Sequence, residues 1–225
     1  MHLAAHSEVP TPETPFSKVN GPVMTYIPPS AHEVRLLKHS LRQTCLARRD
    51  ALDEGARARI SATVCEALLA WLDGRPRTVV SAFWPIRSEL DLRPLMAEAL
   101  ARGHLLALPR IDQGRLTFRA FEGAEEELVD GGFGTRVPQA EAEVRDPTLV
   151  LVPLAAFDRA GGRIGYGKGY YDAALAELAT RQPFTSVACA FETQRVDHVP
   201  MEPHDWRLDW IATEEGLRRA DPAAS

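Results

Sequence analysis

The sequence predicts an α/β protein built on a mainly parallel sheet with helices on both faces. Expected strands alternate with expected helices along the chain, which is the pattern of βα units. The expected strands are also continuous apolar runs, such as LVLVPLAAF at 149–157, as is typical of strands covered on both faces. With 225 residues, of which 45% are hydrophobic, the chain is long enough for one sizeable core and predicts one domain.

The chain is expected to begin with a tail and two helices. Residues 1–31 hold six prolines and show no periodic apolar face, which predicts a proline-rich tail with little regular structure. Apolar side chains then recur every three or four residues, which predicts amphipathic helices over 32–52 and 56–72. The expected buried face of the first helix consists of Val34, Leu37, Leu41 and Cys45.

The rest of the chain is expected to alternate strands and helices. Apolar, β-branched and aromatic runs predict strands over 78–85, 104–111, 115–121, 149–157, 184–191 and 207–213. Helices are expected over 92–103, which ends in glycine, and over 170–181. The acidic, glycine-rich segment up to about residue 147 is expected to be a loop and 218–225 a C-terminal tail, which leaves 32–217 as a single α/β domain.

Composition narrows the class of protein. A formal net charge of −5 argues against a general nucleic-acid or membrane-surface binder, so we expect neither partner. No run of 18 apolar residues and no secretory signal pattern is visible, which indicates a soluble cytoplasmic protein. The cysteines, Cys45, Cys65 and Cys189, are widely spaced without a CxxC pair, so neither a disulfide framework nor a zinc site is expected.

The segment GGRIGYGKGYYD (161–172) lies between an expected strand and an expected helix. It begins like a P-loop, but Gly169 stands where that motif needs Ser or Thr, and the spacing GxGxG also departs from the dinucleotide fingerprint. A strand, a glycine loop and a helix still form an anion-binding arrangement, because the first N–H groups of a helix are unpaired. Arg163 and Lys168 can neutralise phosphate there, and a plain connecting turn is the minor alternative.

Cations and carboxylates elsewhere also suggest chemistry. Lys38 and Arg42 are four residues apart on the first helix, where like charges repel unless an anion lies between them, although a solvated basic face is the commoner explanation. Glu89 and Asp91 follow the first strand, at the edge where a parallel sheet presents its ligand crevice. Capping of the helix that starts near Leu92 is an equally good explanation for these carboxylates, for Asp91 in particular.

Two further carboxylate segments are candidates for a metal. Asp172 lies one turn into the helix at 170–181, where it can stabilise the positive helix end or bind a hard cation such as magnesium. Asp205 and Asp209 lie just before and within the last expected strand. His204 has no second histidine at ligand spacing, which favours a surface position.

Taken in order, these motifs resemble the 5-formyltetrahydrofolate cyclo-ligase family, also called 5,10-methenyltetrahydrofolate synthetase. The similarity covers about residues 32–213, and the glycine loop ending in GYYD is its most specific part. The matching segments are KHSLR (38–42), PIRSELD (85–91), ALPRI (107–111), FGTRVP (133–138), VPLAAFDRAGGRIGYGKGYYDAAL (152–175) and VPMEPHDWRLDWI (199–211).

The resemblance implies a three-layer fold of the NagB/RpiA/CoA-transferase type and a catalytic role for the domain at 32–217. It implies ATP- and magnesium-dependent conversion of 5-formyltetrahydrofolate to 5,10-methenyltetrahydrofolate, with release of ADP and phosphate. The reaction would pass through phosphorylation of the formyl oxygen and attack by N10. Reduced folate and ATP are then the partners, and a monomer is expected.

The resemblance also assigns roles to residues. The implied ATP-binding residues are Lys38, Arg42, Arg163, Ile164, Gly165, Tyr166, Gly167, Lys168, Gly169, Tyr170 and Tyr171. The implied folate-binding residues are Ile86, Glu89, Asp91, Tyr166, Gly167, Lys168, Gly169 and Tyr170. Arg163, Lys168 and Tyr170 would be catalytic, and Asp172 and Asp205 would hold magnesium.

The chain departs from the family pattern in two places. Its N-terminal tail precedes the point where many members begin, and Tyr166 stands where some members carry arginine. The second departure leaves one cation fewer in the loop and places more weight on Arg163 and Lys168. The alternatives are another small-molecule enzyme on the same fold, such as a sugar-phosphate isomerase or CoA-transferase relative, or a non-catalytic folate- or nucleotide-binding protein.

Overall fold

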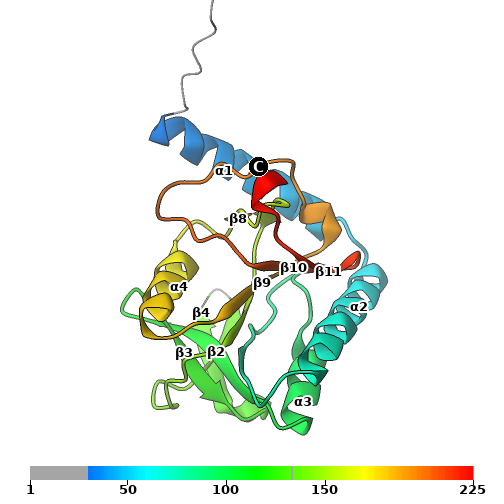
Figure 1. The fold of residues 1–225 in the computed structure, drawn as a ribbon, viewed down its shortest axis with the longest axis vertical. Helices are drawn as coiled ribbons and strands as arrows, with labels where there is room; N and C mark the ends of the chain where they lie inside the picture. Colours follow the sequence, from blue (N-terminus) through cyan, green and yellow to red (C-terminus); the bar gives the residue numbers. More distant parts are fainter. Residues whose placement is uncertain (1–29, 133, 225) are drawn as a thin grey trace, which may run out of the picture.

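The computed structural model describes residues 30–132 and 134–224, and its centre is a seven-stranded sheet (Figure 1). The expected tail lies outside the described residues up to residue 29, and so does Phe133 of the FGTRVP segment. The first helix begins at Ala31, so the last residue assigned to the tail is helical.

The sheet has the strand order β11-β10-β9-β6-β1-β2-β3. Its strands are β1 (Val79–Ser81), β2 (Leu105–Asp112), β3 (Arg115–Phe121), β6 (Leu149–Val152), β9 (Thr185–Cys189), β10 (Trp210–Thr213) and β11 (Gly216–Arg219). The five inner strands run parallel, and the edge strands β3 and β11 are antiparallel to their neighbours. The mainly parallel sheet is therefore confirmed, but the expected C-terminal tail begins too early, because Arg218 and Arg219 belong to β11.

Helices cover both faces of this sheet, as the apolar strands predict. The side chains of β6 alternate between two cores: Leu149 and Leu151 face α2 (Glu54–Asp73) and α3 (Arg93–Ala101), whereas Val150 and Val152 face α4 (Tyr170–Arg181). All four side chains are at most 1% exposed. Burial of each stabilises the fold by about 1.5–3 kcal/mol. Figure 1 shows α2 and α3 on one side of the sheet and α4 on the other.

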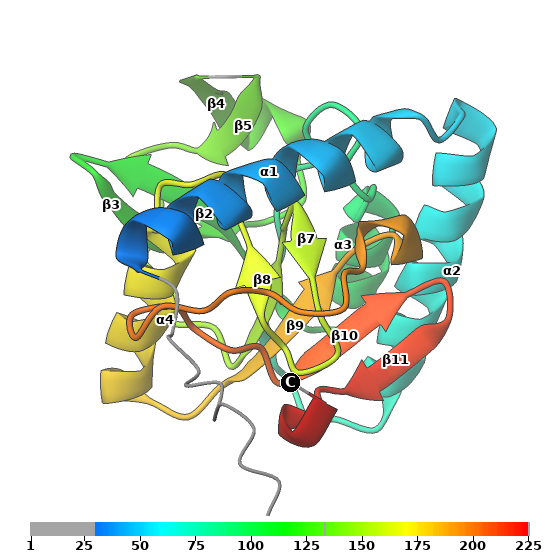
Figure 2. The ribbon, with the colours of Figure 1, turned by 90° about the horizontal axis from the view of Figure 1, so that it is seen from above.

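The first helix, α1 (Ala31–Asp50), covers neither face. It lies across the hairpin of β7 (Ala156–Phe157) and β8 (Arg163–Ile164), as Figure 2 shows. A capping box of Ser30 and Glu33 starts this helix. Its buried residues are Val34, Cys45 and Arg49, whereas Leu37 is 50% exposed, so the expected apolar face is wrong at Leu37.

Two strand assignments differ from the sequence prediction. The run at 149–157 is not one strand: β6 ends before Pro153, which has no N–H to donate to a neighbour, and β7 pairs with β8 in a separate hairpin. The segment expected to be a loop contains a second hairpin of β4 (Leu128–Gly132) and β5 (Thr135–Pro138). The strands expected at 78–85 and 207–213 are also shorter, so Asp209 lies just before β10.

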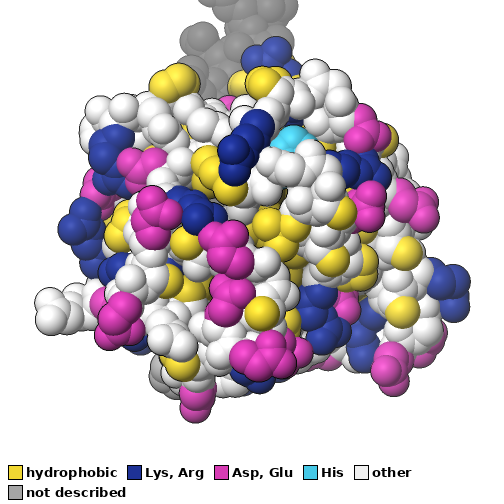
Figure 3. All heavy atoms as spheres, turned by 90° about the horizontal axis from the view of Figure 1, so that it is seen from below, with side chains coloured by type: hydrophobic (Ala, Val, Ile, Leu, Met, Phe, Trp, Pro, Cys, Tyr) yellow, Lys and Arg dark blue, Asp and Glu magenta, His cyan; other side chains and the backbone are white. Residues whose placement is uncertain are grey.

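The surface mixes charges of both signs. Acidic and basic side chains are interspersed among apolar ones on the face in Figure 3. Exposed arginines form ion pairs with nearby carboxylates, as Arg136 does with Glu125 at 3.1 Å. None of the helices in the described part of the chain combines the length and the apolar character needed to cross a bilayer.

Candidate functional site

The segment 161–172 contains β8 and the glycine loop that connects β8 to α4, and a buried aspartate holds its first residues in place. Asp158 is 1% exposed, and its Oδ1 accepts a hydrogen bond of 2.8 Å from the N–H of Gly162. Its Oδ2 accepts another of 2.8 Å from the N–H of Val199. Gly161, with φ of 82°, has no room for a side chain, because a Cβ would lie 2.3 Å from the carbonyl oxygen of Leu208. The loop is therefore fixed to the segment that carries Asp205.

The loop leads into the bare N-terminus of α4. Gly167 and Gly169 have φ of 90° and 67°, a region that favours glycine. Gly169 is the N-cap residue and has no side chain to accept from the first N–H groups of the helix. Those groups carry partial positive charge and are suited to an anion. Tyr170, the first residue of α4, is partly buried against the core beneath the helix.

Arg163 is buried beneath this loop, with 4% of its side chain exposed. Its Nη2 donates to Oδ1 of Asp172 at 2.7 Å, and the same oxygen accepts from the N–H of Trp206 at 3.0 Å. The Nε of Arg163 and the hydroxyl of Tyr171 are buried without a hydrogen-bond partner among the described residues. Burial raises the pKa of Tyr171, so its hydroxyl keeps its proton. Two unpaired donors therefore remain in this part of the site.

Lys38 of α1 reaches the segment before β10. Its Nζ donates to Oδ2 of Asp205 and, at 2.8 Å, to Oε2 of Glu202. The three side chains are 11–18% exposed. Burial alone would lower the pKa of Lys38, but its hydrogen bonds to Asp205 and Glu202 and the negative charges of these carboxylates outweigh burial, and the pKa is raised. The structure thus brings a predicted phosphate ligand, Lys38, into contact with a predicted metal ligand, Asp205.

Arg42 contacts the loop itself. Its Nε donates to the carbonyl oxygen of Gly165 at 2.7 Å, and its guanidinium lies where a side chain at Gly167 would approach within 3.3 Å. Burial lowers the pKa of Arg42 from its ordinary high value. The next residues, Tyr166 to Gly169, are exposed, and Lys168 forms no ion pair with any residue that the structure describes. Lys168 is therefore a cation available to a ligand.

The segment after β1 brings Glu89 to the loop. A tight turn, with Arg87 at φ of 52°, lets Glu89 bond back to Ile86, whose N–H donates to Oε2 at 3.1 Å. The hydroxyl of Tyr166 donates to Oε1 of Glu89. Burial raises the pKa of Glu89 despite the hydrogen bonds from Tyr166 and Ile86. Tyr166 as a whole is 41% exposed, but its hydroxyl lies between Arg49 and Glu89, and desolvation there together with the charge of Glu89 raises its pKa.

Asp91 lies in a different environment. Its Oδ1 accepts from the N–H of Arg93 at 3.0 Å, and its carboxylate pairs with the guanidinium of Arg93, which lowers its pKa. Asp91 also borders a shallow cavity of about 320 Å³ that is lined mostly by α2, including Ser61 and Cys65. Asp91 therefore contacts the start of α3 from the position before its N-cap residue, Leu92, and is not itself the N-cap residue. The structure does not bring Asp91 to the glycine loop.

One group of three side chains in the described part of the chain could hold a metal ion. It consists of Glu202, His204 and Asp205, whose ligand atoms lie within 4.8 Å of one another. Asp172 is not part of this group, but its partner Trp206 follows Asp205 directly. Asp209 has a structural role, because its Oδ2 accepts from the N–H and the hydroxyl of Ser186 at 2.8 and 2.7 Å.

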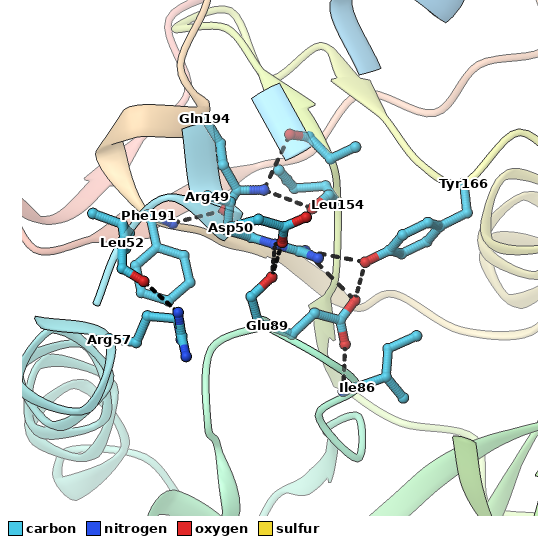
Figure 4. Close-up of polar contacts among 12 residues, drawn as sticks. Arg49, Asp50, Leu52, Arg57, Ile86, Glu89, Leu154, Tyr166, Phe191 and Gln194 are labelled. Carbon is cyan, nitrogen blue, oxygen red and sulfur yellow. Dashed lines mark hydrogen bonds and ion pairs between the residues drawn. The ribbon is translucent and has the colours of Figure 1, made fainter. Parts of the chain in front are cut away.

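Three residues of this region are not among those predicted from the sequence: Arg49, Asp158 and Glu202. Asp158 and Glu202 lie within matched motifs but carry no spacing that singles them out. Arg49 had a signal, because it lies seven residues after Arg42 and therefore on nearly the same side of α1. Figure 4 shows its guanidinium directed toward Tyr166 and Glu89.

In this α/β fold a glycine loop leads to a helix N-terminus whose N–H groups are free, and paired cations and carboxylates surround it. These features are typical of enzymes that bind phosphate-bearing substrates beyond the ends of their strands. The chain belongs to the 5-formyltetrahydrofolate cyclo-ligase family, whose model matches residues 35–214. The resemblance predicted from the motifs is thereby confirmed.

Individual relatives agree over most of the chain. A 5-formyltetrahydrofolate cyclo-ligase of Mus musculus is 26% identical over 204 residues, which cover 83% of this chain and 98% of that protein. One of Mycolicibacterium smegmatis is 30% identical over 187 residues, covering 78% of this chain and 93% of that protein.

Solved structures give the same result for the fold. The NMR structure of Aquifex aeolicus 5,10-methenyltetrahydrofolate synthetase matches with a TM-score of 0.68 at 32% identity, covering 82% of this chain and 93% of that one. A 5,10-methenyltetrahydrofolate synthetase of Mycoplasma pneumoniae, at 22% identity and a TM-score of 0.63, covers 79% of this chain and 98% of that one and shares the fold. The expected NagB-type fold class is confirmed.

Proposed function

We propose that this protein converts 5-formyltetrahydrofolate to 5,10-methenyltetrahydrofolate in an ATP-dependent reaction that releases ADP and phosphate. Family membership supports the activity. The observation that carries the site assignment is that two buried or half-buried cations are each paired with a carboxylate: Lys38 with Asp205 and Arg163 with Asp172. Each pair joins an expected phosphate ligand to an expected metal ligand.

These pairs suggest how the charged substrate is accepted. The phosphates of ATP would take the place of the two carboxylates as partners of Lys38 and Arg163, and Asp172 and Asp205 would then be free to hold a divalent cation. Every buried charge then keeps a partner of opposite sign, which avoids the cost of leaving one unpaired. Lys168, exposed and without an ion pair among the described residues, adds a third cation to the phosphates.

The donor set fits magnesium. Carboxylate oxygens are the ligands that this hard cation prefers, and Asp172 and Asp205 supply them from adjoining segments. When bound, magnesium neutralises charge on the transferring phosphate. Glu202 and His204 lie beside Asp205 and complete a group that could share this role.

We assign the folate to the part of the loop at Tyr166, beside Glu89, which is called the folate end below. Glu89 accepts from Tyr166 and Ile86, and a carboxylate in this position can accept from the amino and ring N–H groups of a pterin. The glycines between Arg163 and Tyr170 let the backbone approach both substrates. Because the contacts of Asp91 face α3, we assign the folate contact to Glu89.

The chemistry follows from this arrangement. The formyl oxygen attacks the γ-phosphorus of ATP, and the bond to ADP breaks. N10 then attacks the activated formyl carbon and loses its proton, and phosphate leaves with the formyl oxygen. Arg163, Lys168 and the free N–H groups at the start of α4 would contact the oxygens on which negative charge gathers, so their part is positioning and charge stabilisation.

The test is a coupled measurement on the purified protein. Methenyltetrahydrofolate absorbance should rise when ATP and magnesium are added with 5-formyltetrahydrofolate, and ADP should form in equal amount. Chelation of magnesium or omission of ATP should stop both signals. Folate or nucleotide binding without turnover would favour a non-catalytic binding protein, and no ADP with this substrate would favour another enzyme on the same fold.

We further propose that a monomer is the working unit. Light scattering of the purified protein tests this. The use of ATP and the three buried free thiols, Cys45, Cys65 and Cys189, support a place in the cytoplasm.

A further inference from the structure

Arg49, in the last turn of α1, is a buried cation with no role in the proposed reaction. It is 2% exposed and is among the largest fully buried side chains of the described residues. Arginine is almost never fully buried unless it is paired. Its neighbour Arg48 is exposed, so burial is specific to position 49.

The guanidinium of Arg49 connects three elements (Figure 4). Its Nε donates to the hydroxyl of Ser88 at 3.0 Å, its Nη1 donates to the hydroxyl of Tyr166 at 3.1 Å, and Nη1 lies 4.0 Å from Oε1 of Glu89. The Ser88 hydroxyl in turn donates to Asp50. One side chain of α1 therefore contacts both the segment after β1 and the glycine loop.

These contacts converge on Glu89, whose side chain is 6% exposed. Glu89 is faced by Arg49 from α1, by Arg87 from its own turn, by Tyr166 from the loop and by Tyr171 from α4. Both tyrosines are neutral, and Arg87 is exposed to solvent. Arg49 is thus the buried positive charge next to this carboxylate, and a buried carboxylate without such a partner becomes neutral.

We propose that Arg49 is a positioning residue for the folate: from α1 it places a positive charge 4.0 Å from the Glu89 carboxylate and holds the Tyr166 hydroxyl against it, so that the substrate meets a fixed acceptor. This inference rests on the proposed function in that Glu89 is taken as the folate contact. Arg49 acts through Glu89 and is not expected to contact ATP.

The test compares Arg49→Met, Glu89→Gln and the double variant, with Arg48→Met as the matched control. Arg49→Met should lower kcat/KM for 5-formyltetrahydrofolate by about 10–100-fold, mainly through KM, with KM for ATP changed less than about twofold. The pH at which kcat/KM for folate falls on the acid side should move upward, a change that a loss of stability alone does not produce. Arg48→Met should behave as wild type.

The double variant decides whether Arg49 acts through Glu89. If it does, Arg49→Met should add less than about threefold to the loss caused by Glu89→Gln alone. Full multiplication of the two losses, or an unchanged folate KM in Arg49→Met, would overturn the proposal. Should Arg49→Met fail to fold, Arg49→Lys keeps a charge but cannot form the two hydrogen bonds in this geometry, and it should show the same folate-specific rise in KM.

Failure of the proposed function gives a different result. In that case the wild-type protein would form no methenyltetrahydrofolate and would not bind 5-formyltetrahydrofolate in calorimetry. A wild type that converts the substrate, together with an Arg49→Met variant of unchanged folate affinity, would reject only the role of Arg49.

Discussion

Replacement of Lys38 by methionine tests the proposal that Asp205 holds magnesium once its ion pair with Lys38 is broken. Lys38 holds Asp205 and Glu202 together, and the three side chains are 11–18% exposed. Removing one partner of a buried ion pair costs about 3–5 kcal/mol, whereas an exposed pair contributes about 0–1 kcal/mol. These side chains lie between the two cases, so we expect a loss of about 1–3 kcal/mol in the free energy of unfolding.

The melting temperature gives the readout. For a chain of this size each kcal/mol shifts Tm by about 2–4 °C, so Lys38→Met should melt about 2–12 °C below wild type without magnesium. The two carboxylates would then lack their cation, and magnesium should bind them better than in wild type. At ten times its Kd, magnesium would return about 1.4 kcal/mol, or about 3–6 °C.

The assay is thermal unfolding followed by circular dichroism, with magnesium chloride compared against sodium chloride at equal ionic strength. Arg35→Met is the matched control, because Arg35 is an exposed cation on the same helix, and its Tm and magnesium response should match wild type. Addition of Asp205→Asn to Lys38→Met should remove the gain. A magnesium response of Lys38→Met equal to that of wild type would refute the assignment of Asp205 to the metal.

Four further predictions concern the loop and the folate end. Lys168→Ala should raise the ATP requirement with little change in Tm, because Lys168 is exposed, and unchanged ATP kinetics would refute its assignment. Gly167→Ala should raise KM for ATP and cost about 1–2 kcal/mol of stability, since φ is 90° and the new Cβ would approach Arg42 within 3.3 Å. The pKa of Glu89 is raised by burial, so kcat/KM for folate should fall on acidification at a pH above the ordinary value of about 4.3, and Glu89→Gln should lack this fall. Because the pKa of Glu89 is higher in the folded protein, protonated Glu89 adds to the free energy of unfolding at low pH, and this contribution is lost as the pH rises through the raised pKa. Asp91→Ala should cost about 0.5–2 kcal/mol through the start of α3 and leave the folate KM unchanged in steady-state assays.

Much of the fold follows from the sequence because its signals are physical and local. Apolar runs predict strands buried on both faces, and the alternation of β6 between two cores shows why polar residues are excluded there. The hairpin of β4 and β5 has no such signal. Both strands are short, β4 is largely exposed and ends in two glycines, and β5 is mostly half-buried, so their pairing depends on neighbours that a local pattern does not reveal.

The site could be predicted only in part for a similar reason. Spacing identified the loop and the pair of cations on α1, because each is contained in one short segment. The choice between Glu89 and Asp91 depended on which carboxylate the turn at Arg87 directs toward the loop, and sequence spacing cannot give that direction. Arg48 and Arg49 are adjacent and identical in chemistry, yet one is exposed and the other is buried, since helical phase decides which of them faces the segment after β1.

Under the proposed site assignment, α1 supplies the cations that a loop with few of its own would need to bind two substrates. Lys38, Arg42 and Arg49 follow one another at steps of four and seven residues, so they share one side of the helix. They contact, in turn, the carboxylates of the expected metal site, the backbone of the loop and the carboxylate of the folate end. At 1.5 Å per residue these cations span about 16 Å along a rigid element, which fixes the two ends of the site relative to each other. Tyr166 therefore does not leave the folate end without a positive charge, because Arg49 reaches the hydroxyl of this tyrosine from the helix.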